Sequence, residues 1–232
     1  MNFLRRESIK SFLEKIDNDR LREIQKRYAG STERYAKYAD VEHWLKINLP
    51  RIRELKLDRS PRKEILDLGC GAGFFLFLAQ QFGHHAVGVD VDLYPLSNEL
   101  IDLFGVERVT HRIRAHQALP DFGRKFDLLT AFSSAFGRSE DESRRWREPT
   151  LRQEVPSEAS APREAGQRDW ESRGWNVEEW KFFLDDLDRH RAPGGKILLE
   201  INSGKDGRYF PAEVREFFLD RGAKVDGERV SF

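Results

Sequence analysis

Apolar residues follow two different periods along the chain, and the change between them divides it into two parts. From residue 2 to about 57, apolar residues recur every three or four positions, which is the period of amphipathic helices. The run 17–19 interrupts this pattern, Gly30 marks a second break, and Pro50 is expected to kink or restart the last helix because proline lacks a backbone donor. We therefore expect an N-terminal helical cap over residues 1–60.

Beyond this part, short apolar runs alternate with helical segments. Strands that alternate with helices imply a parallel sheet that is covered on both faces. After the last helix, which Pro211 starts, two short runs are expected to close the sheet as an antiparallel pair. Residues 61–232 are thus expected to form one α/β domain. The expected strands are 64–68, 86–90, 106–113, 126–131, 196–201, 223–226 and 229–232.

One segment breaks the alternation. Residues 138–174 are rich in Ser, Glu, Arg, Pro and Gly and poor in aliphatic residues, so we expect a disordered or mobile insertion there. Regular structure is expected to resume at Asn176, a suitable N-cap with Glu179 three residues later, as in a capping box. The run 192–195, Ala-Pro-Gly-Gly, is expected to turn the chain into its fifth strand.

Composition excludes several classes of function. The 232 residues contain 40 Lys and Arg and 40 Asp and Glu, so no overall basic bias favours nucleic acid. The single cysteine, Cys70, excludes an intramolecular disulfide and a cysteine-based zinc cluster. The N-terminus lacks a signal-peptide core, and the longest apolar run, 74–79, is too short to span a membrane. We expect a cytoplasmic protein with no metal site, in which His84 and His85 form a solvated loop pair.

The candidate chemistry lies in the run Ile65-Leu-Asp-Leu-Gly-Cys-Gly-Ala-Gly73. A strand leads into a glycine-rich turn, and the turn leads into a helix. Glycines let the backbone approach a ligand closely, and the first turn of the helix offers unpaired N–H groups and the positive end of its dipole. Such a turn suits a dinucleotide or another adenosine ligand.

The run ILDLGCGAGFF, residues 65–75, resembles the first motif of the class I S-adenosylmethionine (SAM) dependent methyltransferases. Three further parts resemble this family: the end of the second expected strand, the loop 117–120 with the fourth strand, and the turn 192–195 into the fifth strand. The resemblance implies a Rossmann-like α/β fold with a seven-stranded, mostly parallel sheet and an N-terminal helical extension, and it implies SAM as the cofactor. It implies that Asp90 binds both ribose hydroxyls and that Asp67 lies near the methionine end. The full set of expected cofactor-binding residues is Asp67, Gly69, Cys70, Gly71, Gly73, Asp90, Val91, His116, Gln117 and Ala131.

The sequence departs from this family at Ala115, where members often carry an acid that binds the adenine amino group. Gln117, or the backbone beside His116, is expected to replace that contact. No catalytic base is assigned, since methyl transfer from an activated sulfonium depends mainly on alignment. Phe132 and Phe136 follow the fourth strand and either wall the pocket or belong to the core.

These observations favour methyl transfer from SAM to a small-molecule acceptor. Methylation of a protein or RNA is a second hypothesis, and a SAM-binding scaffold without catalysis is a third. An NAD-dependent oxidoreductase is the rival at the level of the fold. The glycine spacing G-x-G-x-G disfavours it, because dinucleotide-binding turns follow G-x-G-x-x-G.

Overall fold

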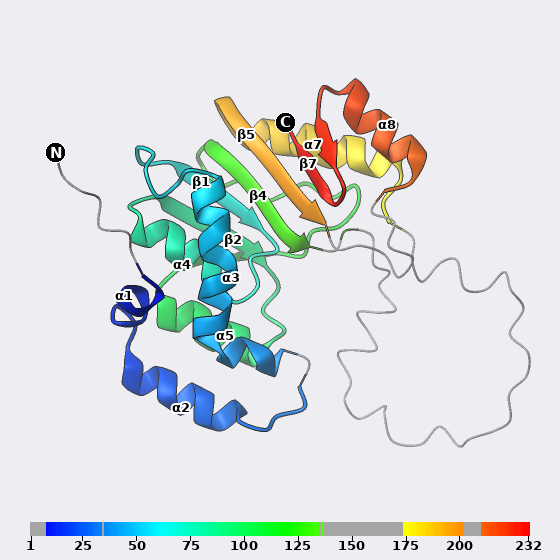
Figure 1. Ribbon diagram of the computed structural model, residues 1–232. Coiled ribbons are helices and arrows are strands. Elements are labelled where there is room, and N and C mark those ends of the chain that lie inside the picture. Colours follow the sequence, from blue (N-terminus) through cyan, green and yellow to red (C-terminus); the bar gives the residue numbers. More distant parts are fainter. Residues whose placement is uncertain (1–7, 34, 135, 137–173, 202–209) are drawn as a thin grey trace, which may run out of the picture.

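The computed structural model of the protein describes residues 8–33, 35–134, 136, 174–201 and 210–232. A seven-stranded sheet forms its centre, with the strand order β3-β2-β1-β4-β5-β7-β6 (Figure 1). The strands are β1 (Glu64–Leu68), β2 (His85–Asp90), β3 (Glu107–Thr110), β4 (Phe126–Ser134), β5 (Arg191–Ile201), β6 (Lys224–Asp226) and β7 (Arg229–Ser231).

The first five strands run parallel, and the last two form the expected antiparallel pair. β1 lies between β2 and β4, and its partners are parallel on both sides. β7 pairs antiparallel with both β5 and β6. The predicted fold class, a mostly parallel seven-stranded α/β sheet, is therefore confirmed. The strand order reverses between β1 and β4, and ligands of open α/β sheets bind at the carboxyl ends of the strands at such a point.

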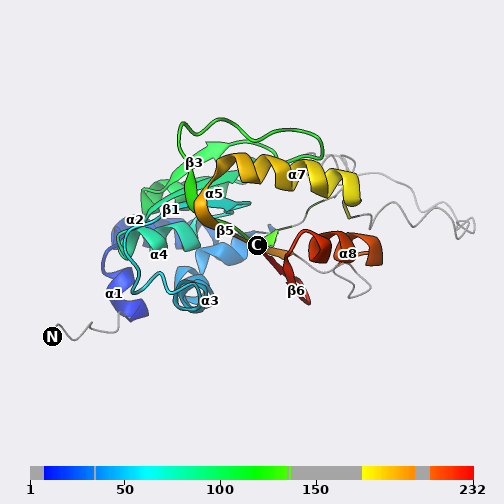
Figure 2. The same ribbon diagram turned by 90° about the horizontal axis from the view of Figure 1, so that it is seen from above.

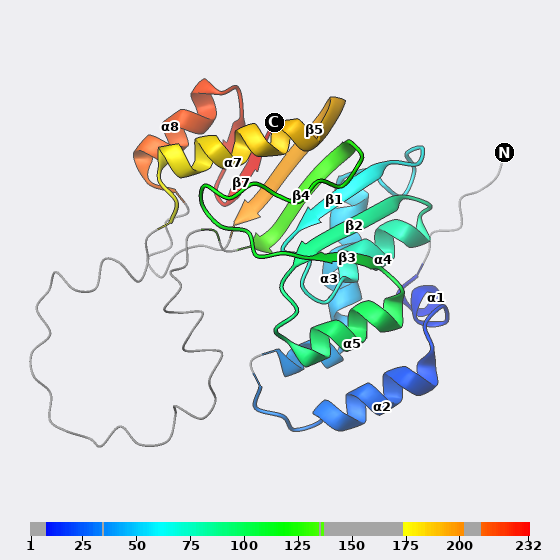
Figure 3. The same ribbon diagram turned by 180° about the vertical axis from the view of Figure 1, so that it is seen from behind.

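Helices cover both faces of the sheet. One hydrophobic core lies between the sheet and the helices that precede β3, and a second lies between the sheet and α7 and α8. Figure 1 places α3 and α4 in front of the sheet, whereas the reverse view in Figure 3 brings α7 to the front; Figure 2 views the layers from above. The helices are α1 (Ile9–Leu13), α2 (Asn18–Tyr28), the 3-10 helix η1 (Ala36–Ala39), α3 (Val41–Glu54), α4 (Phe74–Gln81), α5 (Pro95–Phe104), α7 (Val177–His190) and α8 (Ala212–Asp220).

The N-terminal helices share a core with the sheet. Phe12 of α1, Ile24 of α2 and Ile52 of α3 are buried in the same cluster as Ile65 of β1. α3 passes through Pro50 as one helix, so the expected restart at this residue does not occur. A separate cap domain over residues 1–60 stays a prediction.

The second half of the chain follows its local signals closely. Asn176 caps α7 through a capping box with Glu179, as predicted. β5 begins at Arg191, earlier than expected, because the run 192–195 bulges within the strand: Phe126 pairs with Arg191 and Leu128 with Lys196. The predicted insertion lies outside the described residues, apart from Gly174. Within the described ranges, no helix has the length and apolar character needed to cross a membrane.

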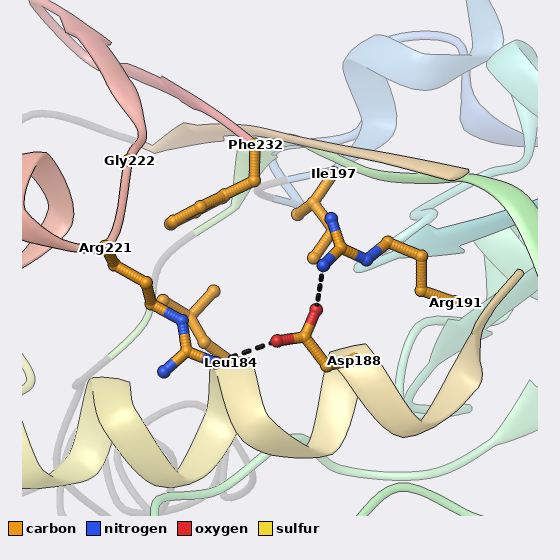
Figure 4. A pocket seen from close by; sticks show the side chains of 7 residues that line it. All are labelled: Leu184, Asp188, Arg191, Ile197, Arg221, Gly222 and Phe232. Carbon is orange, nitrogen blue, oxygen red and sulfur yellow. Dashed lines mark hydrogen bonds and ion pairs between the residues drawn. The ribbon is translucent and has the colours of Figure 1, made fainter. Parts of the chain in front are cut away.

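A cavity of about 270 Å³ lies between α7, β5 and the connection from α8 to β6 (Figure 4). Asp188 sits between two guanidinium groups there, 2.5 Å from Arg191 and 2.8 Å from Arg221. Arg221 also pairs with Asp185 at 2.7 Å. Two carboxylates thus balance two guanidinium charges, and the cluster ties α7 to β5 and to the end of α8.

Candidate functional site

The glycine-rich turn joins the end of β1 to the start of α4. Gly69, Gly71 and Gly73 have φ values of 73°, 56° and 79°, a region that residues with a Cβ rarely adopt. The N–H of Gly69 donates to the carbonyl of Val89 at 2.7 Å, and the N–H of Gly73 donates to that of Cys70 at 3.0 Å. The turn is thereby fixed against the end of β2.

Asp90, the last residue of β2, contacts this turn directly. Its Oδ2 accepts a hydrogen bond from the N–H of Gly71 at 2.6 Å, and its Oδ1 accepts one from the N–H of Val91 at 2.7 Å. Burial raises the pKa of Asp90, while both N–H groups and the charge of Arg108 act to lower it. The structure therefore brings together the glycine turn, Asp90 and Val91, three parts of the predicted site.

Gly71 borders open space, unlike the other two glycines of the turn. A Cβ on Gly73 would lie 2.7 Å from Ile101 Cδ1, and a Cβ on Gly69 would lie 2.6 Å from Ser134 Oγ. A Cβ on Gly71 would meet no heavy atom of the described residues within 4 Å. The backbone of Gly71 is thus open to a ligand, whereas Gly69 and Gly73 are required by packing inside the protein.

Asp67 lies on β1 beneath the turn and is 3% exposed. Its Oδ1 accepts a hydrogen bond from Thr130 Oγ1 at 2.7 Å. Burial raises the pKa of Asp67 to about 7, although the Thr130 hydroxyl and the charge of Arg51 act to lower it. The carboxyl is therefore poised to change charge near neutral pH, and a cation bound close to it would favour the ionised form.

Cys70 packs inward from the turn. A Cβ added to Gly88 of β2 would collide with Cys70 Sγ and lie 2.8 Å from Cys70 Cβ. Burial raises the pKa of the Cys70 thiol well above its ordinary value, and the charges of Asp90 and Asp67 act in the same direction. Because the thiolate is the nucleophilic form, this raised pKa disfavours a nucleophilic role for Cys70, and its side chain packs against Gly88.

Of the remaining predicted residues, two lie in the connection after β3 and one lies within β4. His116 and Gln117 are exposed in the segment between β3 and β4, and His116 has a positive φ of 56°. The His116 ring lies 5.6 Å from that of Phe182 on α7. Ala131 is buried within β4 and pairs with Leu199, so its side chain belongs to the core.

Of the two aromatic residues that follow the fourth strand, Phe136 belongs to the core. Its ring lies 5.1 Å from that of Trp175 and 5.2 Å from that of Phe183. Phe132 packs 4.8 Å from the ring of Phe75, and the guanidinium of Arg51 lies 4.5 Å above it. Phe132 therefore joins the sheet to α4 and to α3.

Sequence reasoning missed a polar network at the ends of β4 and β5. Ser133 has a positive φ of 52°, and its Oγ lies 3.1 Å from Arg51 Nη2 and 3.3 Å from Glu200 Oε1. Burial acts to raise the pKa of Glu200, but Arg51 and Arg229 outweigh it and hold the pKa below its ordinary value. An acid near the end of an apolar strand is the signal that identifies Glu200 in the sequence.

The prediction that His84 is solvated is wrong. Its side chain is buried, its Nδ1 accepts a hydrogen bond from the N–H of Lys63 at 3.1 Å, and its Nε2 lies 2.7 Å from the carbonyl of Leu57. One acceptor and one donor fit the neutral ring with its proton on Nε2. Within the described part of the chain, no group of three His, Cys, Asp or Glu side chains could hold a metal ion.

No family model matches the chain, and no curated protein matches it. Several solved structures are similar in the arrangement of their elements. DesVI of Streptomyces venezuelae is 14% identical with a TM-score of 0.47, and the match covers 81% of this chain and 90% of that one. In this chain the strands β1 to β5 run parallel and the strand order reverses beside β1. The fold is Rossmann-like.

Two further similar structures differ in what they act on. CalS10, an amino pentose methyltransferase from Micromonospora echinaspora, is 20% identical with a TM-score of 0.40, and the match covers 68% of this chain and 50% of that one. A ribosomal protein L11 methylase from Lactobacillus delbrueckii is 14% identical with a TM-score of 0.40, and the match covers 78% of this chain and 75% of that one. This chain spans about half of the length of CalS10.

Proposed function

We propose that this protein is a SAM-dependent methyltransferase that binds its cofactor at the carboxyl ends of β1 and β2. The observation that carries the proposal is the 2.6 Å hydrogen bond from Gly71 to Asp90, which sets a carboxylate beside an open glycine backbone. This pairing lies next to the reversal of strand order, where α/β sheets bind nucleotide ligands.

The residues present fit the groups of SAM. The two bonds that Asp90 accepts use about half of the roughly four lone-pair positions of a carboxylate, so it can also accept hydrogen bonds from two ribose hydroxyls. The open backbone of Gly71 suits the amino acid part of the cofactor. Asp67 provides a buried carboxyl whose ionised form would balance the cationic end of SAM.

The sheet supports SAM over NAD. The dinucleotide-binding fold has the strand order 3-2-1-4-5-6 with parallel strands. In this protein an antiparallel strand, β7, lies between β5 and β6. The topology thus agrees with the glycine spacing in disfavouring a dinucleotide.

Bound SAM supplies a methyl group that its sulfonium already activates. The protein then needs to hold the acceptor in line and to exclude water. Hydrogen bonds from Arg51 to Ser133 and Glu200 link three polar side chains at the ends of β4 and β5. The ring of Phe132 packs beneath Arg51. We propose a small-molecule acceptor, because 40 basic residues balanced by 40 acidic ones disfavour RNA.

Titration calorimetry with SAM, S-adenosylhomocysteine and NAD tests the cofactor. We expect Asp90→Ala to weaken SAM binding by about 1–3 kcal/mol, the scale of a lost hydrogen bond to a charged group. Asp92→Ala is the matched control, since Asp92 is exposed two residues later, and it should bind SAM as the parent does. Tighter binding of NAD than of SAM, or unchanged SAM affinity in Asp90→Ala, contradicts the proposal.

Transfer of labelled methyl groups tests the acceptor. The protein is incubated with SAM and with separated small-molecule, protein and RNA fractions, with Asp90→Ala as the background. Label in the small-molecule fraction supports the proposal, and label in protein or RNA supports the second hypothesis. SAM binding without transfer to any fraction supports a non-catalytic scaffold.

A further inference from the structure

Asp186 on α7 is a buried carboxylate beneath the loop that follows β3. It is 2% exposed, whereas Asp185 and Asp188 on the same helix are only partly buried. Its Oδ2 accepts a hydrogen bond from the backbone N–H of Leu119 at 2.7 Å. Its Oδ1 lies 2.9 Å from Arg189 Nη2, and this ion pair balances its charge.

The loop over residues 111–119 is anchored at both ends. At its start, the N–H of His111 donates to the carbonyl of Asp90 at 2.9 Å. At its end, Leu119 donates to Asp186. The hydrogen bond at the start of the loop joins it to Asp90, the expected ribose-binding residue, so the loop is fixed to the end of β2.

α7 also supports the middle of this loop. Phe182 precedes Asp186 by four residues, so both side chains lie on the same face of the helix. The Phe182 ring makes an edge contact with the ring of His116 at 5.6 Å. His116 has a φ of 56°, which is unfavourable for a residue with a Cβ, so surrounding contacts must hold it in this conformation.

We propose that Asp186 is a positioning residue for the adenine end of the cofactor site. It acts through Leu119, with Phe182 beside it, and sets the loop that carries His116 and Gln117. The inference rests on the proposed function, because it assigns the adenine to this loop. It explains how a chain with alanine at position 115 keeps an ordered adenine side: backbone groups held by α7 replace an acidic side chain on the loop.

The test compares S-adenosylhomocysteine with S-inosylhomocysteine, which differs only in its base. The variants are Asp186→Leu, which removes the acceptor, and Asp186→Asn, which retains one acceptor oxygen. Asp185→Leu is the control for the loss of a neighbouring acid. We expect Asp186→Leu to weaken S-adenosylhomocysteine binding about tenfold, the scale of one lost hydrogen bond, and the other two variants to bind within about threefold of the parent.

The preference for adenine over hypoxanthine separates positioning from mere stability. In the parent the two ligands should differ in affinity. In Asp186→Leu the ratio of the two dissociation constants should move toward one. A variant that is only less stable would lose affinity for both ligands equally, and that result overturns the inference. If Asp186→Leu does not fold, Phe182→Ala, which removes the His116 contact, must reduce the same preference. A parent that binds neither ligand instead overturns the proposed function.

Discussion

Arg51 on α3 and Glu200 on β5 form an ion pair with 2.5 Å between Nη2 and Oε1, although 149 positions separate them in the sequence. Both side chains are largely buried, at 16% and 10% exposure. Glu200 also binds Arg229 of β7 at 2.9 Å, and Arg229 in turn pairs with Glu54 at the end of α3. The N-terminal helices are thus tied electrostatically to the far half of the sheet.

We expect Arg51→Met to lower the free energy of unfolding by about 1–3 kcal/mol. The variant leaves a largely buried carboxylate with one guanidinium partner in place of two, and the lost bonds involve charged groups. Urea unfolding followed by circular dichroism measures the change. Arg22→Met is the control, since the Arg22–Asp19 pair is exposed and such pairs contribute little. Equal loss in the two variants would show that the Arg51 pair has no special role.

The contacts that sequence reasoning anticipated are those set by strand ends. Asp90 follows a short apolar run, and parallel pairing of β1 with β2 brings its carboxylate to the glycine turn. Neighbouring parallel strands end at the same edge, so no long-range information was needed. Local spacing alone also predicts the capping box of α7, because its two residues are three positions apart.

The contacts that it missed join distant segments through polar groups. Helical periodicity identifies which face of α3 is buried, but it does not say that Arg51 meets Glu200. In the same way, the pair His84-His85 has the composition of a surface loop, and only the approach of Leu57 and Lys63 makes His84 a buried one. Asp186 carried a usable signal, because it lies three residues after the buried Phe183 on the apolar side of α7.

Gly88 is required by the side chains that pack against it. A Cβ at this position would collide with Cys70 Sγ and lie 2.7 Å from Leu76 Cδ1. We expect Gly88→Ala to destabilise the protein by about 1–3 kcal/mol, as overpacking of a core does, and to weaken SAM binding by displacing the glycine turn. Thermal unfolding and calorimetry measure the two effects.

The clash at Gly88 also predicts a coupling. Cys70→Gly removes two of the three colliding atoms, so Gly88→Ala should cost less stability in a Cys70→Gly background than in the parent. Gly174→Ala is a matched control, since a Cβ there meets no atom of the described residues within 4 Å and its φ is not positive. Additive effects of the two changes at positions 70 and 88 would contradict this explanation of Gly88.

The raised pKa of Asp67 predicts how the free energy of unfolding of the ligand-free protein depends on pH. In the unfolded chain its carboxyl ionises near its ordinary pKa of 3.8, whereas burial raises the pKa to about 7 in the folded protein. Between these values the folded state binds more protons than the unfolded state, so this group lowers stability as pH rises from about 4 to about 7 and then has a constant effect. Asp67→Asn keeps an acceptor for Thr130 but removes the titration.

We therefore expect Asp67→Asn to be more stable than the parent at pH 8, by about 2–4 kcal/mol at about 1.4 kcal/mol per pKa unit, and the difference to vanish near pH 4. Urea unfolding at several pH values measures this, with the exposed Asp92→Asn as the control that should follow the parent curve. A difference in stability between Asp67→Asn and the parent that is the same at pH 5 and pH 8 would contradict the raised pKa.

The carboxylate of Asp67 should also make SAM binding tighter at pH 8 than at pH 6, because a cationic ligand favours the ionised form. Asp67→Asn should abolish that pH dependence of binding.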